Sequence, residues 1–334
     1  MSYRSPIARQ PEALADTHAA VLDQLDGADL SGLLRPVIGV TGIGASFAAA
    51  VVGAAELQAR GQRGVAIRAC DMAAGHDLAD TLVGLSAGGR SIETVTAFEK
   101  LPSARRIGIS QDGAGPLAGV SDFHLTIRQG ADATPSSVGY TATLLGMGLL
   151  FDRLLGASGT GFADLPAVVG EVLSQAADKM ARIGTQFADR RAIDCVGAGA
   201  SLGTADGASL LIREAARLPA SAYDTRHYLH GPLEAMDATT GVLIIGDGRE
   251  VELARQVERI GCPVVLVTTD SSVQDGDGLT VIHVPRRDNL IAQGIVDILA
   301  PQLIAAQLSD AAGLTDVKFR YRMQDTKVKT EAAA

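Results

Sequence analysis

The sequence contains few cysteines, and their number and spacing exclude two classes of protein, disulfide-rich and metal-binding. Its 334 residues contain no tryptophan and only three cysteines, Cys70, Cys195 and Cys262, which stand far apart without metal-binding spacing. Two of them stand in or beside apolar, strand-like runs, where a small buried thiol is the usual finding. An odd number of cysteines without a disulfide framework is typical of a reducing compartment. The sequence therefore predicts no disulfide scaffold and no metal site.

Positive charge and long apolar runs are scarce as well. There are 38 acidic residues against 29 lysines and arginines, and this net charge of −9 argues against a nucleic-acid binder with a basic face. Lysine and arginine become more frequent between Lys318 and Lys329, but acids stand among them, and we expect a solvated tail there. No stretch reaches the about 18 uninterrupted apolar residues that cross a bilayer, and the first sixteen residues lack the apolar centre of a signal peptide. We therefore expect a cytoplasmic protein without a membrane span.

What the sequence does have is a series of short apolar runs followed by helical patterns. The runs are rich in β-branched residues and do not alternate with polar ones, which is typical of parallel strands covered by helices on both faces. The sequence therefore predicts an α/β fold. The runs lie at 37–42, 81–86, 105–110, 123–128, 192–201, 219–223, 241–247, 263–269 and 280–285, and a last helix is expected from Leu290 to Leu308.

The two halves of the chain begin alike. Each has a strand, then Gly-x-Gly-Ala-Ser, then a helix, with "GIGAS" at 42–46 and "GAGAS" at 197–201. This repetition predicts an internal duplication of one doubly wound domain. We expect two parallel-sheet domains in tandem, each a flavodoxin-like three-layer sandwich. The expected bounds are 1–30 for an N-terminal helical segment, 31–160 for the first domain, 161–187 for a helical linker, 188–312 for the second domain and 313–334 for a tail.

The Gly-x-Gly turns invite a dinucleotide-binding interpretation that their neighbours do not support. Phe47 and Leu202 replace the third glycine of that fingerprint, so neither a nicotinamide nor another cofactor is expected. The amides at the start of the following helix still favour an anion. In the first segment, which contains Gly44, Ser46 is equally suited to holding a phosphate and to capping the helix. In the second segment, Ser201 is expected to cap the helix.

A loop rich in serine and glycine, "LSAGGRSIET", follows the second expected strand. Ser86 ends the strand, Gly88 lies in a tight turn, and Ser91 begins a helix beside Arg90. This is the sheet edge at which doubly wound folds bind ligands, so the loop is a candidate anion site. The alternative is an ordinary glycine-rich loop with a serine N-cap. The same two interpretations hold for a second helix start, "TPSSVGYT", which contains Ser136 and Ser137.

The segment "IREAARLPASAYDTRHYLHGPLEAMD" combines a carboxylate and an imidazole. Two of the six histidines, His227 and His230, fall within four positions, and Glu214 ends an apolar helix sixteen residues before His230. Alone, each is more often a surface residue. Together they suit proton transfer between two sugar carbons, because a carboxylate can carry the proton and an imidazole can open the sugar ring.

In this order the motifs resemble the tandem sugar isomerase (SIS) family. They are similar to the isomerase half of glucosamine 6-phosphate synthase and to related amino-sugar phosphate deaminases and fructoselysine 6-phosphate deglycases. The resemblance covers almost the whole chain, from "IARQPEAL" through "GASF" and "SAGGRSIET" to the tail "DTKVKTE". Its most specific part is "REAARLPASAY" followed by "YLHGPLEAMD", in which the interval of sixteen residues is preserved.

The resemblance implies a role for each candidate residue. Glu214 would move a proton between C1 and C2, and His230, entering from the neighbouring subunit, would open the ring. The protein would then be a homodimer with shared active sites and an anionic sugar, expected to be a sugar phosphate, as substrate. Lys327 would correspond to the lysine of a tail that closes over the site. The substrate's anionic end would be held by Gly44, Ser46, Ser86, Gly88, Arg90, Ser91 and either Ser136 or Ser137.

The chain also departs from the family pattern. The phosphate loop has Ala87 and Gly88 where the family has glutamine and a second serine, Arg90 replaces a glutamate, and Leu211 replaces a lysine. The expected function is therefore an aldose–ketose isomerase or an amino-sugar phosphate deaminase or deglycase, with two alternatives. One is a non-catalytic sensor of sugar phosphates, and the other is an isomerase of a sugar with a different anion, such as a sulfonate.

Overall fold

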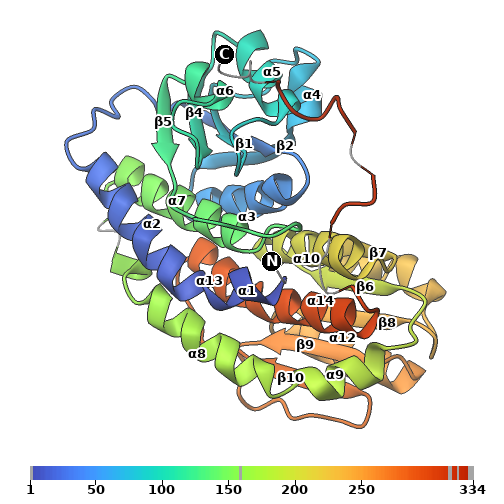
Figure 1. Ribbon diagram of the computed structural model, residues 1–334. Helices are drawn as coiled ribbons and strands as arrows, with labels where there is room; N and C mark the ends of the chain where they lie inside the picture. The colour runs from blue at the N-terminus through green and yellow to red at the C-terminus, as the bar shows by residue number, and fades with distance from the viewer. Residues whose placement is uncertain (1–2, 158–159, 315–317, 322, 330–334) are drawn as a thin grey trace.

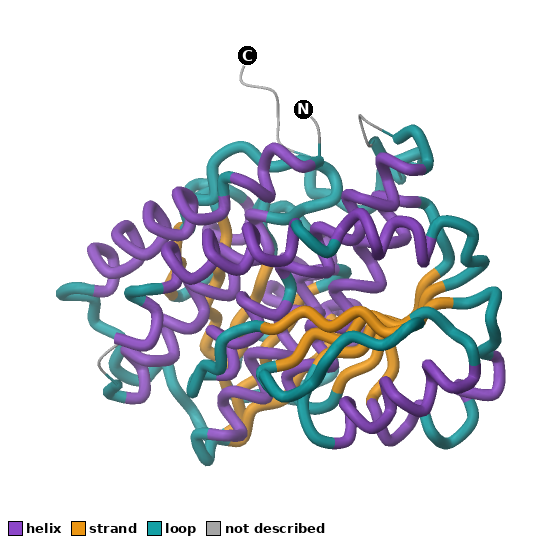
Figure 2. Tube along the Cα trace, turned by 90° about the horizontal axis from the view of Figure 1, so that it is seen from below, coloured by secondary structure: helices purple, strands orange, loops and turns teal. Residues whose placement is uncertain are grey.

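The computed structural model of the chain describes residues 3–157, 160–314, 318–321 and 323–329, and it has an α/β architecture (Figure 1). Two five-stranded parallel sheets lie at opposite ends of the molecule, with helices between and around them (Figures 1 and 2). The first sheet contains β1 (Val37–Gly42), β2 (Arg63–Arg68), β3 (Thr81–Leu85), β4 (Arg105–Ser110) and β5 (Phe123–Thr126). The second contains β6 (Ile193–Gly197), β7 (Ala220–Asp224), β8 (Gly241–Ile245), β9 (Val264–Thr268) and β10 (Leu279–His283).

The two sheets have the same strand order. The first runs β2-β1-β3-β4-β5, and the second, read from its other edge, runs β7-β6-β8-β9-β10. Both are the 2-1-3-4-5 order of flavodoxin-like folds, in which the order reverses beside the first strand and a ligand crevice opens at the carboxyl ends. Strands β3, β8 and β9 are buried along their whole length, as the apolar runs predicted. The predicted bounds of the domains, the linker and the tail stay predictions.

The helices follow the predicted alternation with a few differences. Strand β2 and the short helix α4 were not predicted, and the last helix is divided at Ile298 into α13 and α14. The first unit has α3 (Ala45–Ala59), α4 (Ala69–Ala73), α5 (Ile92–Lys100), α6 (Pro116–Gly119) and α7 (Val138–Leu155). Around the second are α8 (Leu165–Ala177), α9 (Met180–Phe187), α10 (Ala200–Leu211), α11 (Thr225–Tyr228), α12 (Arg249–Ile260), α13 (Leu290–Asp297) and α14 (Leu299–Ala311), while α1 (Arg4–Ala8) and α2 (Gln10–Leu25) begin the chain.

A layer of apolar helices between the sheets forms the centre of the core (Figure 1). Helices α3 and α10 pack closely there, since a Cβ on Gly203 would come within 2.6 Å of the Ala48 carbonyl oxygen. Two stretches, Val138–Leu155 and Leu290–Ala311, are long and apolar enough to cross a membrane by length and composition. In each, 83% of the relevant window is buried inside the fold, which is the behaviour of core helices.

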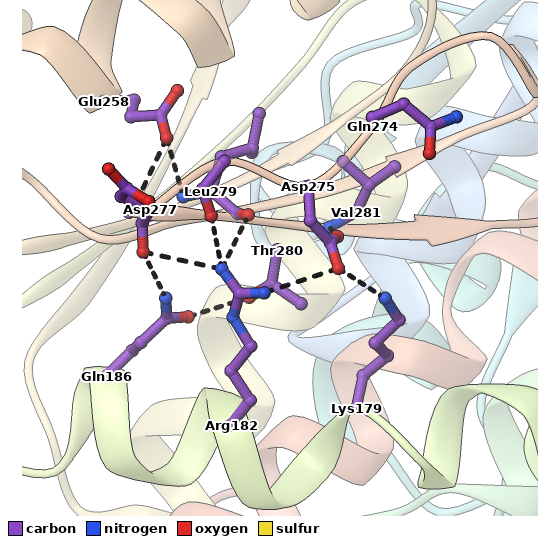
Figure 3. A network of polar contacts seen from close by, with 12 residues as sticks. Lys179, Arg182, Gln186, Glu258, Gln274, Asp275, Asp277, Leu279, Thr280 and Val281 are labelled. Carbon is purple, nitrogen blue, oxygen red and sulfur yellow. Dashed lines mark hydrogen bonds and ion pairs between the residues drawn. The ribbon is translucent and has the colours of Figure 1, made fainter.

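A polar network attaches α9 to the second sheet (Figure 3). The Asp275 carboxylate lies 2.6 Å from the Lys179 ammonium and also accepts from the Val281 amide. Arg182 donates to the backbone carbonyls of Gly276 and Asp277, before β10, and of Leu279, at its start. Gln186 accepts a hydrogen bond from the Thr280 hydroxyl at 2.8 Å. These contacts hold α9 against the side of the second sheet. Helix α9 lies between the two halves of the chain.

Candidate active site

The two Gly-x-Gly-Ala-Ser segments form the same turn. Gly44 has φ 59° and ψ −131°, and Gly199 has φ 58° and ψ −124°, a left-handed conformation that favours glycine. These glycines are the N-cap residues of α3 and α10, and neither helix has a side-chain capping bond. The prediction that Ser201 caps its helix is therefore wrong, because Ser201 falls inside the first turn. Ser46 occupies the matching position in α3, half-buried, and it does not cap its helix either.

The predicted anion loop lies at the carboxyl end of β3, beside β1, where the strand order of the first sheet reverses. Ser86 and Ser91 are 4% and 3% exposed, and the Ser91 amide donates to the Ser86 hydroxyl at 3.3 Å. Ser91 stands at the N-cap of α5, yet its hydroxyl donates to the Glu93 carboxylate at 2.9 Å instead of capping. Ser91 thus takes the N-cap position that the ordinary-loop alternative expects, but its side chain makes no capping bond.

The tail pairs with this loop. Lys327 and Ser91 form an antiparallel β-bridge, and the Val328 amide donates to the Arg90 carbonyl at 2.9 Å. The Arg90 guanidinium donates in return to the Val328 carbonyl, at 3.2 and 2.9 Å. Figure 1 shows the described tail segments, in red, crossing from the second sheet to α5. The structure therefore brings Lys327 to the loop and gives Arg90 a partner in the tail, while its contact with an anion stays a prediction.

The second serine-rich helix start is already occupied by a carboxylate. Asp132 accepts hydrogen bonds from the Ser136 and Ser137 hydroxyls at 2.7 and 3.1 Å, and from the Ser137 and Gly139 amides. An acid at the start of α7 is favoured by the helix dipole, so Asp132 fills the place predicted for a substrate anion. Sequence reasoning missed Asp132, although an acid just before a serine-rich helix start is a recognisable capping signal.

Glu214 lies on an unusual piece of backbone at the end of α10. Residues Ile212–Ala216 form a π-helical turn, a feature frequent at functional sites, and Arg217 follows with φ 58°. A left-handed conformation costs a non-glycine residue about 1–2 kcal/mol. Just before the turn, the Leu210 side chain lies 3.7 Å from where a Cβ on Gly44 would stand, so this end of α10 reaches the Gly-x-Gly turn of the first sheet.

Glu214 lines a cavity of about 560 Å³, a size that suits a sugar-sized ligand. Burial raises the pKa of Glu214 to about 7, against the opposing effect of the Arg213 charge. A carboxyl group that titrates near neutral pH can both accept and return a proton. The other residues that line the cavity are Arg213, Arg217, Leu218, Pro219, Lys318, Phe319, Arg320 and Tyr321.

His230 lies elsewhere on the same chain. It is exposed, in a turn before Gly231, and its amide donates to the His227 carbonyl at 2.9 Å. It is not among the described residues that line the Glu214 cavity. One chain thus presents the imidazole at its surface and the carboxylate in a cavity, which leaves the predicted contribution from a neighbouring subunit open.

Two further residues near the site were not predicted. Tyr3 is buried, and burial followed by the charges of Asp132 and Glu214 raises the pKa of its hydroxyl. Arg68, at the carboxyl end of β2, places its guanidinium 4.8 Å from the ring centre of Phe47, in the first turn of α3. No sequence pattern around Tyr3 or Arg68 predicted a place near the site, because both residues approach it only through tertiary packing.

Comparison with known proteins finds relatives that share one name. No family model matches the chain. A glutamine–fructose-6-phosphate aminotransferase (isomerizing) from Sulfolobus acidocaldarius is 23% identical over 72% of this chain, and one from Photorhabdus laumondii is 25% identical over 63%. The matches span 41% and 38% of these two proteins, so the chain corresponds to about two fifths of their length.

Solved structures share the fold over nearly the whole chain. A glucosamine-6-phosphate deaminase from Thermotoga maritima has a TM-score of 0.81 at 20% identity, covering 96% of this chain and 97% of its own. The C-terminal domain of glucosamine-fructose-6-phosphate aminotransferase from Francisella tularensis has 0.80 at 17%, covering 94% and 97%. A tagatose-6-phosphate ketose/aldose isomerase from Escherichia coli has 0.77 at 19%, covering 96% and 97%. Together with the curated relatives, they confirm the resemblance to the sugar isomerase family.

Proposed function

We propose, from this confirmed resemblance and the geometry of Glu214, that the chain moves a proton between C1 and C2 of a phosphorylated sugar. The observation that carries the proposal is a carboxyl group with a pKa of about 7 on a π-helical turn in a cavity of about 560 Å³. Catalytic groups perform best when their pKa lies near the working pH. The substrate class is supported by relatives and structural neighbours whose names include phosphosugar isomerases and a deaminase.

The proposed step requires no cofactor. In isomerisation, the Glu214 carboxylate removes the proton from C2 of the open-chain aldose, and the carbonyl oxygen at C1 takes a proton from water to give an enediol. Glu214 then returns its proton to C1, and the C2 hydroxyl releases its proton to water as it becomes the ketone, which replaces the proton taken up at the C1 oxygen. If C1 carries an amine instead, the reverse transfer from C1 to C2 gives an imine, and water releases the amine.

The anionic end of the sugar would lie at the first sheet. The Gly44 turn with Ser46 and the loop from Ser86 to Ser91 present amides and hydroxyls at the edge where the strand order reverses, and Lys327 pairs with that loop. The hydroxyls of Ser136 and Ser137 already donate to Asp132, and that of Ser91 donates to Glu93, so a substrate anion would compete with these carboxylates. We include in the proposal a tandem of two sugar isomerase domains, a homodimer in which His230 comes from the partner subunit, and a cytoplasmic location.

A ligand screen followed by turnover tests this function. Thermal shift against sugar phosphates, amino-sugar phosphates and sulfonated sugars should identify ligands, and the protein should then convert at least one of them. Stabilisation by sugar phosphates without turnover of any would instead favour the non-catalytic sensor. Stabilisation and turnover confined to sulfonated sugars would favour the isomerase with a different anion.

A further inference from the structure

Four of the nine described residues that line the cavity around Glu214 are cationic. Within the described part of the chain, its charged lining residues are Glu214 and four cations, Arg213, Arg217, Lys318 and Arg320. The chain as a whole carries a formal net charge of −9, so a cavity with one acid and four cations departs strongly from the average surface. Two of these cations come from the end of α10 and two from the tail, and they therefore face a common space from two directions.

Arg217 carries a backbone cost that its side chain must offset. Its φ of 58° is the left-handed conformation that usually ends a helix with glycine. Glycine at this position would be the more stable choice, so the presence of an arginine indicates that its guanidinium has a use. One nitrogen of that guanidinium donates a long hydrogen bond of 3.4 Å to the Lys318 carbonyl, which links α10 to the tail across the cavity.

We propose that the substrate carries a second anionic group, attached beyond C1, which Arg217 and Arg213 bind. This inference rests on the proposed function, because it is Glu214 that locates C1 and C2 in the cavity. The proposed function places the phosphate at the loop from Ser86 to Ser91, none of whose residues lines this cavity, so the cations around Glu214 would face whatever extends past the reacting carbons. Planar guanidinium groups suit a carboxylate, to which they donate paired hydrogen bonds.

Two matched ligands isolate this recognition. They are conjugates of 1-amino-1-deoxyfructose 6-phosphate that carry glycine or glycinamide on the C1 nitrogen, so they differ by a carboxylate against a neutral amide. A carboxylate at C1 itself would not serve, because it imitates the enediolate that any isomerase stabilises. Calorimetry gives the Kd of each conjugate, and the ratio of the two Kd values reports the contribution of the second anion.

We expect the wild type to bind the glycine conjugate roughly 10-fold more tightly or better, the range of charge-assisted hydrogen bonds. In Arg217→Gly and in Arg213→Gln the ratio should fall below about 3. Arg217→Gly should not lower Tm, since glycine suits φ 58°, and a change in the ratio cannot then come from unfolding. Arg63→Ala removes the same charge at the exposed start of β2 and should leave the ratio unchanged.

Equal affinity of the wild type for both conjugates, binding of neither, or a ratio that survives both variants would overturn the second-anion proposal. Proton transfer is scored separately, by hydrogen exchange at C1 or C2 of sugar phosphates in D₂O. Exchange with a ratio near one leaves the proposed function standing without the second anion. If the protein binds the glycine conjugate more tightly than the glycinamide conjugate but exchanges no sugar hydrogen, the proposed function is refuted and the cavity is left as an anion-binding site.

Discussion

The guanidinium of Arg90 donates two hydrogen bonds to the backbone carbonyl oxygen of Val328, at 3.2 and 2.9 Å. The loop that we propose for the phosphate is therefore tied to the C-terminal tail by a side chain that replaces an acid of the family pattern. The same tail lines the Glu214 cavity with Lys318 and Arg320 further upstream. One segment thus contacts both the anion loop and the cavity of the proposed base.

Replacing Arg90 should loosen the tail. In Arg90→Ala we expect KM for an anionic sugar to rise roughly 10-fold, on the scale of charge-assisted hydrogen bonds, and limited proteolysis of the tail to become faster. Arg90→Lys should restore both in part, because an ammonium can replace one of the two bonds. A higher KM with unchanged proteolysis would mean that Arg90 contacts the anion directly. Unchanged values of both would show that the contact has no functional role.

Removing the charge of Asp132 should destabilise the fold. In Asp132→Asn the start of α7 loses a carboxylate that accepts from two hydroxyls and two amides, so we expect a loss of about 1–3 kcal/mol in the free energy of unfolding. Chemical denaturation measures this loss. Asp189→Asn, at an exposed position, is the matched control and should change little. Equal stability of the two variants would contradict the capping role of Asp132.

Because the pKa of Glu214 is raised, we expect Glu214→Gln to stabilise the fold more at high pH than at low pH. The pKa is about 7 in the folded protein and near 4.5 when unfolded, so the folded state binds more protons between these values and loses stability as pH rises through that window. Glu214→Gln removes this loss. Its stability relative to the wild type should therefore rise by roughly 1–3 kcal/mol between pH 4 and pH 8, as followed by denaturation. A difference that is independent of pH would show that Glu214 is not buried as described.

Mixed dimers should reveal whether active sites are shared between subunits. Glu214→Gln and His230→Asn proteins should each be inactive, because one lacks the base and the other the ring-opening group. After subunit exchange, some mixed dimers would hold one site with both residues intact, and activity should return. A protein that runs as a monomer, or mixtures that stay inactive after proven exchange, would refute the shared site.

The sequence predicted nine of the ten strands that the structure describes and missed β2. Strand β2, "RGVAIR", mixes exposed and buried positions at a sheet edge, so it carries no signal of a strand buried on both faces. The continuous apolar pattern after Leu290 gave no indication of the break at Ile298. Ser201 was misjudged because the left-handed glycine two residues earlier takes the cap position.

The identity of the site residues stays a prediction from the sequence, and their surroundings became visible only in the structure. The spacing of Glu214 and His230 is visible in the sequence, but the π-helical turn and the burial that raises the pKa of Glu214 depend on packing against distant elements. The pairing of Lys327 with Ser91 joins residues more than two hundred positions apart, and no local pattern encodes it. Arg217 gave no signal because its importance lies in a backbone angle.

Hydrogen exchange at the reacting carbons shows whether Glu214 carries a proton between C1 and C2. In D₂O the wild type should introduce deuterium at C1 or C2 of a sugar phosphate that it binds, as seen by NMR. The rate should rise as pH passes through about 7, where Glu214 ionises. Glu214→Gln should still bind the sugar and exchange at least roughly 100-fold more slowly, the scale of general-base catalysis. Exchange at the wild-type rate in that variant would contradict the account.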